Sequence, residues 1–561
     1  MEFLHLFTAD AQRQEPALYF NKRRPEVRQR SSIRIHRCED QHGAFGSNDK
    51  DQVDIFMRLN FQVIFFIIFF VSPAIFAYFT SSSVFVMPLV YVFWLLLAVS
   101  LATVIIFQWQ MFKADRYTAK LIHRSAGSRL ISFVVSYNEN VEMVKKTLIA
   151  VKKANIFGET WLLDDSNDPK IVSGLAEVCE ELGIKFVHRN NRRGFKAGAI
   201  NDALKRVDDS YEFMAVFDSD QRPTPRFFNG VFSYFDRKMV AVVQMPQTYT
   251  AISTAISESA FFQQEVFLRK IMRARNGRSA FILGSGFVAR ISAIRSVGGF
   301  REDVVTEDLA TSILLQSLGW EIVYVDSTDI WYGRPPETIS AYLTQQGRWS
   351  LGGFQALSII LGLKLKLSVY AEYMAGWLYW IWVGPIRLVS IIILILFLDF
   401  RLITVMINPV FFVFFYFPYF IYSMLFYHYT ASDGLMNYGI RGFFLHQGAE
   451  LLLMFTVTSS FISWILRRRK PFKVTPKGVR GSYSFWQAMP MISIELLMTS
   501  TVSAGLVWIR ETASRLMQLA IAVNIFFALY LIPFMIAASV ILFTSNYNGE
   551  KNEISLHRIN T

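Results

Sequence analysis

Two acidic residues, Asp218 and Asp220, lie in the sequence DSD directly after the apolar run MAVF. In an extended chain, residues two apart point the same way, so both carboxylates can face one ion. Hard oxygen ligands of this kind suit Mg²⁺ or Mn²⁺, which proteins commonly share with a diphosphate. A solvated turn is the alternative interpretation. The position at the end of an apolar strand favours the ion site.

A second acidic pair, Asp164 and Asp165, ends the apolar run TWLL. These carboxylates can bind the base or ribose of a nucleotide, or they can belong to an ordinary turn or helix cap. The segment RRGFKAGAIN (192–201) is small, basic and opens a helix, which suits an anionic ligand. Lys196 within it can reach a diphosphate. A charged helix start without a ligand would have the same pattern.

The sequence Thr306-Glu307-Asp308 precedes an amphipathic stretch, LATSILLQSLGW. Thr306 can cap this helix, with the acidic residues in its first turn, and that structural role needs no further function. A carboxylate at this position can also act as general base on a hydroxyl group. The spacing alone is compatible with both roles.

A third motif, QxxRW, contains Gln345, Arg348 and Trp349. Helical spacing places Gln345 next to both other residues. An arginine fork binds phosphate, and a tryptophan ring offers a flat apolar face to a sugar. The alternative is an interfacial helix whose Arg and Trp lie among lipid headgroups.

The region from 113 to about 344 must position these groups. Apolar strand-like runs alternate in it with helical stretches, which predicts a parallel sheet with helices on its faces. The polar sequences SYNE, DDSND and DSD all fall at strand ends. Ligands of such sheets bind beyond the carboxyl ends of the strands, so we expect the candidate residues to meet there.

The composition places this soluble region in a membrane protein. The chain is 53% hydrophobic, with 52 Phe, and 18% charged. Its net charge of +13 lies largely beside apolar segments, which indicates lipid rather than nucleic acid as the partner. Two cysteines without a CxxC pair do not indicate a disulfide framework or a zinc site.

Apolar runs long enough to cross a bilayer occur at 61–79, 84–109, 374–398, 405–427, 491–509 and 516–543. A further run, 442–466, is followed at once by the basic segment 467–480. If this run spanned the membrane, the basic segment would lie outside, against the positive-inside tendency. We therefore expect six spans, with this helix at the interface; seven or eight spans are the alternatives. The soluble region, the basic segment and both termini then share the cytoplasmic side.

The resulting domain organisation has eight parts. The apolar region starts too late for a signal peptide, so residues 1–57 are expected to be a flexible cytoplasmic extension. The remaining parts are two spans (58–112), a soluble catalytic domain (113–345), an interfacial helix region (346–372), two spans (373–428), an interfacial helix with a loop (429–484), two spans (485–545) and a short cytoplasmic tail (546–561).

The order of these motifs resembles the processive family 2 glycosyltransferases, most closely the cellulose synthase-like group that includes bacterial cellulose synthase catalytic subunits. The match runs from about 130 to 478. Its most specific elements are TED, then PETISAYLTQQGRW (336–349), then FKVTPKG (472–478), which looks like the group's gating loop. The resemblance implies a multi-pass α-helical membrane protein with a cytosolic α/β (GT-A, Rossmann-like) glycosyltransferase domain.

The resemblance also implies a role for each matching residue. Residues expected to bind the uridine of a UDP-sugar are Tyr137, Glu139, Asp164 and Asp165. Residues expected to bind its diphosphate or to close over the nucleotide are Lys196, Asp218, Gln345, Arg348, Thr475 and Lys477. Asp218 and Asp220 would hold Mg²⁺ or Mn²⁺.

The candidate catalytic carboxylates are Asp308 and Glu307, of which Asp308 would deprotonate the acceptor hydroxyl. Trp349 would stack under the terminal sugar of the polymer. Two features differ from bacterial cellulose synthases: the metal motif continues as DSDQ rather than with His, and only about 17 residues follow the last span. The latter gives no indication of a cyclic-di-GMP-binding module.

The expected function is therefore synthesis and export of a β-linked glycan, from UDP-glucose in the first instance, with inversion at the anomeric carbon. The alternatives are a single-transfer enzyme that makes a glycolipid or lipid-linked sugar, and a transporter or scaffold with a degenerate transferase domain. Partner subunits and homo-oligomers remain open. Arg387 and Glu495 fall within expected spans, where charge is costly, and we expect them to border the glycan path near each other.

Overall fold

The computed structural model describes residues 106–111, 113–114, 129–228, 231–249, 252–326, 330–403, 412–432, 438–468 and 485–545. All of these belong to one of two compact units, Pro73–Thr561. The expected N-terminal extension, most of the first two spans and the tail 546–561 lie outside the described residues. The segment 472–478, which contains Thr475 and Lys477 and was expected to be a gating loop, lies outside them as well.

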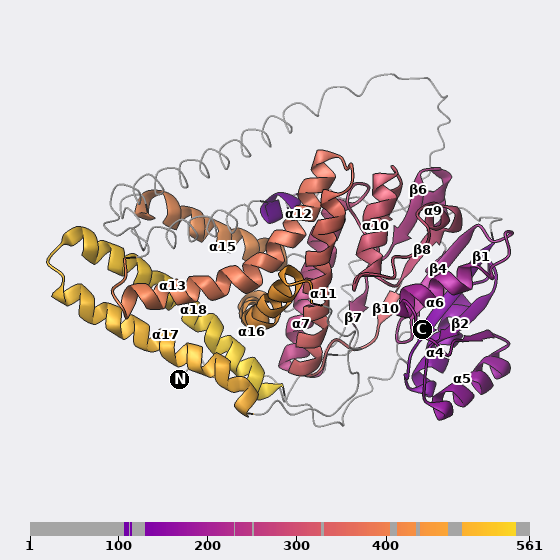
Figure 1. The fold of residues 1–561 in the computed structure, drawn as a ribbon, viewed down its shortest axis with the longest axis horizontal. Coiled ribbons are helices and arrows are strands. Elements are labelled where there is room, and N and C mark those ends of the chain that lie inside the picture. Colours follow the sequence, from indigo (N-terminus) through magenta and orange to yellow (C-terminus); the bar gives the residue numbers. More distant parts are fainter. Residues whose placement is uncertain are drawn as a thin grey trace, which may run out of the picture. The chain divides into compact units, whose positions relative to one another are not determined.

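The soluble part is built on a seven-stranded sheet with the order β3-β2-β1-β4-β8-β6-β9 (Figure 1). A second, three-stranded sheet has the order β5-β10-β7. The strands are β1 Leu130–Ser136, β2 Thr160–Asp164, β3 Lys185–His188, β4 Phe213–Asp218, β5 Arg222–Pro223, β6 Val240–Gln244, β7 Thr248–Tyr249, β8 Phe287–Arg290, β9 Glu321–Tyr324 and β10 Ile330–Tyr332.

The strands alternate their side chains between two buried faces. Leu130, Val134 and Leu162 face one core, in which helices α4 and α5 cover the sheet. Ile131 and Phe133 face the other core, to which α6, α9 and α10 contribute. The helices of the soluble part are α4 Val141–Ala154, α5 Pro169–Leu182, α6 Phe195–Leu204, η1 Phe232–Asp236, α7 Ala255–Val266, η2 Phe267–Met272, α8 Arg273–Arg275, α9 Ile291–Ser296 and α10 Glu307–Ser317.

The sheet is not wholly parallel, which corrects the sequence-based expectation. Strands β3, β2, β1 and β4 are parallel, as predicted, but β8 is antiparallel to both β4 and β6. The reason is the connection that leads into β8. Phe287, its first residue, pairs with Val216 and Gln244 at the carboxyl ends of their strands, so β8 can only run back toward their amino ends.

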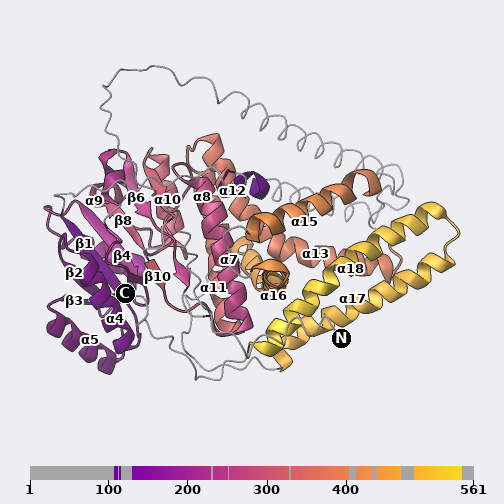
Figure 2. The ribbon, with the colours of Figure 1, turned by 180° about the vertical axis from the view of Figure 1, so that it is seen from behind.

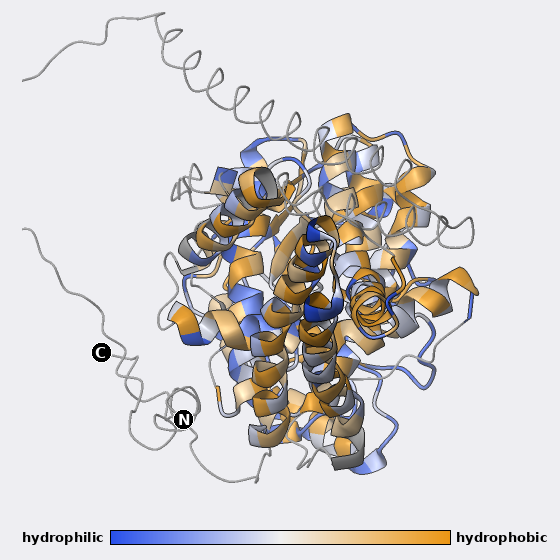
Figure 3. Cartoon of the chain, turned by 90° about the vertical axis from the view of Figure 1, so that its left-hand side faces the viewer, coloured by the Kyte–Doolittle hydropathy of each residue, from blue (hydrophilic) through white to orange (hydrophobic). Residues whose placement is uncertain are grey.

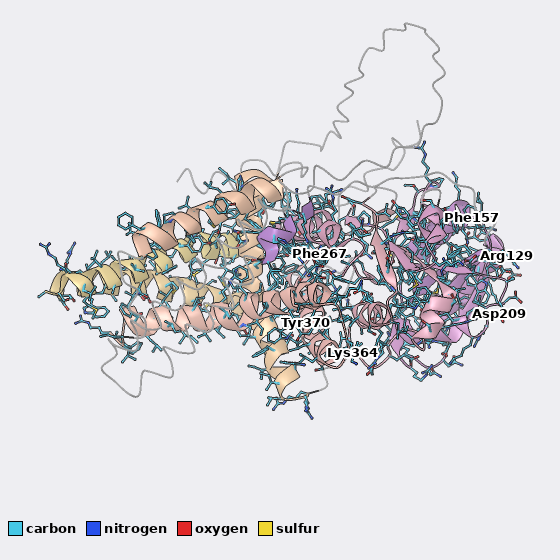
Figure 4. All side chains as sticks on the ribbon, turned by 90° about the horizontal axis from the view of Figure 1, so that it is seen from above. Arg129, Phe157, Asp209, Phe267, Lys364 and Tyr370 are labelled. Atoms are coloured by element: carbon cyan, nitrogen blue, oxygen red, sulfur yellow. The ribbon has the colours of Figure 1, made fainter. Side chains whose placement is uncertain are left out.

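The carboxyl ends of the parallel strands face the helical part of the molecule. Arg129, Phe157 and Asp209 lie near the amino ends of β1, β2 and β4, and Figure 4 shows them at the end of the soluble part that is remote from the long helices. Lys364 and Tyr370 lie at the junction between the two parts. Ligands bound beyond the strand ends would therefore lie on the side of the long helices.

Long helices form the second part of the chain (Figures 1 and 2). They are α11 Ile339–Leu361, α12 Leu367–Ile381, η3 Trp382–Ile386, α13 Arg387–Leu398, η4 Phe412–Tyr416, α15 Phe417–Ser432, α16 Gly439–Ile465, α17 Phe485–Glu511 and α18 Arg515–Thr544. Figure 3 shows mostly hydrophobic colours along them.

Four helical segments in the described part of the chain are long and apolar enough to cross a membrane. They are Leu367–Leu398, Gly439–Ile465, Ala488–Glu511 and Arg515–Thr544. The first, third and fourth contain expected spans. The expected span 405–427 is described only from 412 onward, where η4 and α15 lie. Gly439–Ile465 meets the length criterion as well, although we expected this helix at the interface.

Helix α16 runs crosswise to α17 and α18 and is seen nearly end-on in Figures 1 and 2. It contacts α11, η3, α7 and α18, so it packs against both parts of the molecule. Its packing against α18 is closest at Gly448, where a methyl group would lie 2.9 Å from Ala538 N and 3.0 Å from the Ala537 carbonyl carbon. Only a glycine leaves room for this approach.

Two charged residues of the helical part have partners other than those expected. Arg387 and Glu495 were expected near each other, but the Arg387 guanidinium lies 3.3 Å from the Glu450 carboxylate on α16. Glu495 accepts a hydrogen bond of 2.6 Å from Ser539 Oγ. Sequence could not indicate the Arg387 partner because Glu450 lies 63 residues away, on a helix that crosses the others.

Replacing Gly448 with valine should lower the free energy of unfolding by about 1–3 kcal/mol, because the side chain would push α16 away from the α18 backbone. Thermal unfolding of the detergent-solubilised protein measures this loss. Gly362→Ala is the matched control, since its methyl group would meet carbonyl oxygens only at 3.6 Å and beyond. Equal melting temperatures for Gly448→Val and the wild type would show that α16 is not held this closely.

Candidate active site

The end of β4 brings a basic and an acidic candidate residue together. Lys196, near the start of α6, forms an ion pair with Asp218. The backbone N–H of Asp218 donates a 2.7 Å hydrogen bond to Ser285 Oγ, which anchors the end of the strand. Helix α6 begins after Gly194, whose φ of +65° lets the chain turn into the helix beside β4. A diphosphate at this position would meet both an ammonium group and a carboxylate-bound cation.

Asp220, the second acid of the DSD motif, is 5% exposed. Its carboxylate lies against the backbone of Gly333. A methyl group added to Gly333 would be only 2.6 Å from Asp220 Oδ2. Asp218 is more open, with 28% of its side chain exposed. No cluster of three or more His, Cys, Asp or Glu residues suited to a metal occurs within the described ranges. A cation held by these two carboxylates would therefore need further ligands, such as phosphate oxygens.

Glu307 and Asp308 occupy the first turn of α10, where the sequence analysis expected them. Thr306 is at the N-cap position, but its side chain makes no capping hydrogen bond. Asp308 Oδ2 lies beside Gly284, where a methyl group would be 3.2 Å from the carboxylate and 3.9 Å from Lys196 Nζ. The TED motif and the Lys196–Asp218 pair therefore share one site.

Burial raises the pKa of both carboxylates. For Asp308 the pKa reaches about 7, because burial disfavours its charge and the neighbouring Glu307 carboxylate repels it. Burial also raises the pKa of Glu307, and this is opposed by Lys196 and Arg348. Asp308 is thus poised to exchange a proton near neutral pH, as a general base requires.

Helix α11 carries the QxxRW residues and packs directly on the TED motif. A methyl group at Gly352 would lie 2.3 Å from Thr306 Oγ1, so the helix backbone touches this side chain. Gln355 Oε1 accepts a 3.0 Å hydrogen bond from the Val305 N–H. Gln345, Arg348 and Trp349 are half-buried on the same helix. The positive charge of Arg348 is among the influences that oppose the raised pKa of Glu307.

Two loops at the other end of the site are joined by hydrogen bonds. The Asn138 N–H donates 2.8 Å to Ser166 Oγ, and its side-chain amide donates 2.6 Å to Asn167 Oδ1. Tyr137 lies beneath the Arg192 guanidinium, 3.2 Å from the ring centroid, and Glu139 is half-buried. This region offers an aromatic face and a cation, which suits a nucleotide base.

Asp164 and Asp165 are buried and already bind protein groups. Asp164 accepts 2.6 Å from Ser166 Oγ and lies 2.8 Å from His188 Nδ1. Asp165 is held in a two-bonded fork by Arg189, with distances of 2.8 and 2.6 Å. Both carboxylates therefore organise the loops around the site, and their contact with uridine stays a prediction.

Sequence reasoning did not identify Gly284, Ser285, Arg189 or Arg192 as site residues. The two glycines of the sequence GSG at 284–286 were an available signal, because paired glycines indicate an unusual backbone turn. Both do have positive φ, of +82° and +67°. The basic segment 192–201 was identified, but not the stacking of its first arginine on Tyr137. The Arg189–Asp165 pair has no sequence signature.

Residues 213–427 match the family model described as "Glycosyl transferase family group 2". A cellulose synthase catalytic subunit [UDP-forming] of Xanthomonas axonopodis pv. citri is 30% identical over 278 residues, covering 45% of this chain and 36% of that protein. A probable glucomannan 4-beta-mannosyltransferase of Oryza sativa is 30% identical over 204 residues, covering 34% of each.

Among solved structures, a mannosyltransferase from Pyrobaculum calidifontis in complex with GDP-Man and Mn²⁺ is similar with a TM-score of 0.49 and 13% identity, covering 68% of this chain and all of that one. That likeness is too weak to support a functional conclusion. The chain spans about a third of the length of the two curated relatives above.

Residues 213–427 thus match glycosyltransferase family group 2, and the α/β sheet with its acidic site is compatible with that match. The chain is similar in sequence to cellulose synthase catalytic subunits and to glucomannan mannosyltransferases.

Replacing Arg189 with methionine should lower the free energy of unfolding by about 3–5 kcal/mol, because it leaves the buried Asp165 carboxylate without its fork. Arg193→Met is the matched control. Arg193 is 56% exposed, and the loss of its surface ion pairs should cost less than about 1 kcal/mol. Denaturant unfolding followed by tryptophan fluorescence compares the two. Equal losses would contradict the role assigned to the buried fork.

Proposed function

We propose that this protein is a membrane-embedded synthase that transfers sugar from a nucleotide sugar to a growing β-linked glycan and passes the product across the membrane. The observation that carries the proposal is the meeting of Lys196, Asp218 and Asp308 with the QxxRW helix α11 at the junction with the long helices. Helix α11 also packs along α16, so a product leaving the site would meet the helical part directly.

The reaction would be a single inverting displacement. Asp308 accepts the proton of the acceptor hydroxyl, whose oxygen attacks the anomeric carbon from the face opposite to the nucleotide. The bond from that carbon to the diphosphate oxygen then breaks. Lys196 and Arg348 offset the charge on the departing diphosphate, which therefore needs no proton to leave. One general base is therefore enough for this reaction.

The DSD carboxylates have the donor chemistry of a Mg²⁺ or Mn²⁺ site. Asp218 and Asp220 supply hard oxygen ligands two residues apart at a strand end, and Asp218 is open to a ligand. A bound cation would supply charge neutralisation for the diphosphate. Lys196, which pairs with Asp218 in this structure, would then turn to the phosphates.

The aromatic residues of α12 and η3 support a sugar path through the helical part. The indole of Trp380, a residue of α12, packs against the α11 backbone at Gly353. A methyl group added to Gly353 would be 2.7 Å from Trp380 Nε1. The Trp377 ring lies 6.4 Å from Trp464 of α16. These rings pack against other helices of the protein and do not face lipid alone, and their use as stacking faces for sugars is part of the proposal.

The membrane arrangement we propose keeps the transferase domain, the basic segment after α16 and both termini in the cytoplasm. The crosswise course of α16 relative to α17 and α18 supports its placement at the interface, despite its sufficient length. Arg467 and Arg468 at its end would then remain on the cytoplasmic side. Thr475 and Lys477 would close over the nucleotide from the segment that follows.

The donor sugar is proposed as glucose on UDP, and mannose is the second candidate. Relatives named as cellulose synthases favour UDP-glucose, whereas relatives named as glucomannan mannosyltransferases favour a mannose donor. Contacts to the uridine, the diphosphate and the metal are the same for donors that differ only in the hexose, so these contacts do not identify the sugar. The alternative of a single transfer to a lipid acceptor would not require Trp349 at the helical junction.

The purified protein, supplied with Mg²⁺ or Mn²⁺, should convert one of three radiolabelled donors, UDP-glucose, UDP-N-acetylglucosamine or GDP-mannose, into polymer. Linkage-specific glycanases identify the product. Asp308→Asn should lower the rate by at least about 10²-fold, since it removes the general base. Exclusively short, lipid-extractable product would replace the synthase with the single-transfer enzyme, and equal rates for Asp308→Asn and wild type would remove Asp308 from the mechanism.

The turnover number should rise as pH increases through about 7 and level off above it, because Asp308 accepts a proton only when ionised and its pKa is about 7. Release of the nucleoside diphosphate between pH 5.5 and 9 measures this. Glu307→Gln should move the rise to lower pH, since the Glu307 charge contributes to the raised pKa of Asp308. A flat wild-type profile over this range would indicate a base with an ordinary carboxyl pKa.

A further inference from the structure

Residues 279–285 (SAFILGS), here called the strap, connect helix α8 to strand β8 and end at the active site. At the site end, Ser285 Oγ accepts the hydrogen bond from the Asp218 N–H. Gly284 lies against the Asp308 carboxylate and close to Lys196. The strap therefore touches the nucleotide-side acid and the proposed base at once, and its position sets the distance between them.

The other end of the strap is tied to helix α12, at the start of a candidate membrane span. Ser279 donates a hydrogen bond to the Glu372 carboxylate, and the Arg278 guanidinium lies 2.7 Å from the same carboxylate. Arg275 donates 2.6 Å to the Glu372 backbone carbonyl. Glu372 has no exposed surface, and Arg275 is 3% exposed. This is a buried ion cluster, in which each charge depends on the others.

The middle of the strap is held by α10 and by the residue after Glu372. Tyr373 donates 2.9 Å to Gln316 Oε1, and Gln316 Nε2 donates 2.6 Å to the Ala280 carbonyl. The Ile282 N–H donates 2.9 Å to Ser312 Oγ. Ser312 in turn donates 2.7 Å to the backbone carbonyl of Asp308. Continuous hydrogen bonds thus join α12, the strap and the helix that carries the TED motif.

We propose that Glu372, together with Tyr373, is a positioning residue for glycosyl transfer: it anchors the strap to the membrane-proximal helix α12 and so holds Gly284 and Ser285 against Asp308 and Asp218. This inference rests on the proposed function for the assignment of Asp308 as base. It also implies that a movement of α12 would reach the site through the strap rather than through the sheet.

A purely structural anchor is the competing explanation, and it makes a different prediction. An anchor that only stabilises the protein would affect unfolding and leave the turnover of folded enzyme unchanged. A positioning role instead lowers the turnover number much more than it raises donor KM, because Lys196 and Arg348, the proposed diphosphate-binding cations, lie on α6 and α11 rather than on the strap. Misplacement by about 1 Å is enough to cost on the order of 10²-fold in rate.

The test uses the full chain in detergent with three variants. Glu372→Gln removes the buried charge, and the double variant Ser279→Ala/Tyr373→Phe removes two hydrogen bonds while keeping the Glu372–Arg278 ion pair. The control is Glu258→Gln. Glu258 on α7 forms a 2.8 Å ion pair with Arg441 of α16, which also joins the soluble part to a long helix but makes no contact with the strap.

Two quantities are measured for each variant: turnover number and donor KM from initial rates, and hydrogen exchange of the amides of 280–285 by mass spectrometry. The double variant should lose about tenfold in turnover number, with donor KM within about twofold of the wild type. Its strap amides should exchange faster than in the wild type, whereas the amides of β1 should exchange at the wild-type rate. The folded fraction of Glu372→Gln should lose at least as much turnover number as the double variant. Glu258→Gln should match the wild type in both measurements.

Unchanged turnover and unchanged strap exchange in the folded double variant would overturn the inference. Uniformly faster exchange throughout the soluble part would do the same, since it indicates general destabilisation. Failure of the wild type to transfer any of the three sugars would instead count against the proposed function. Hydrogen exchange would still show in that case whether Glu372 and Tyr373 hold the strap.

Discussion

The contact between helix α11 and the TED motif is the constraint on which the site depends. Gly352 lies so close to Thr306 that no larger side chain fits at position 352. This approach fixes the helix carrying Gln345, Arg348 and Trp349 against the helix carrying Asp308. The residues that we propose as base, as phosphate-binding arginine and as sugar-stacking ring thereby belong to one junction between the soluble part and the long helices.

A second constraint acts through the crosswise helix α16. It packs through Gly448 against α18 and presents Glu450 to Arg387, so the helical part is held together by close backbone contact and by a buried ion pair. Helix α11 lies along it. The active site is thus attached to the helical part from two sides, through α11 on α16 and through the strap on α12.

Local patterns were sufficient to predict the first half of the soluble domain. The strands β1, β2, β3 and β4 and the helices between them follow from apolar runs, caps and turn residues that lie close in sequence, and Asn140 and Asp168 cap α4 and α5 as such residues commonly do. The antiparallel β8 could not be predicted in this way. Its direction depends on where the preceding helices deliver the chain, which is a matter of long-range packing.

The sequence by itself determined the candidate groups of the site and their order: the DSD and TED carboxylates, Lys196 and the QxxRW helix, because strand ends and helix starts are local features. Only the tertiary structure decided which groups meet. The Asp165–Arg189 fork, the Arg387–Glu450 pair and the Glu372 anchor of the strap join residues 24, 63 and about 90 positions apart. Such pairs leave no periodic signal, because burial and charge compensation are settled when the elements pack.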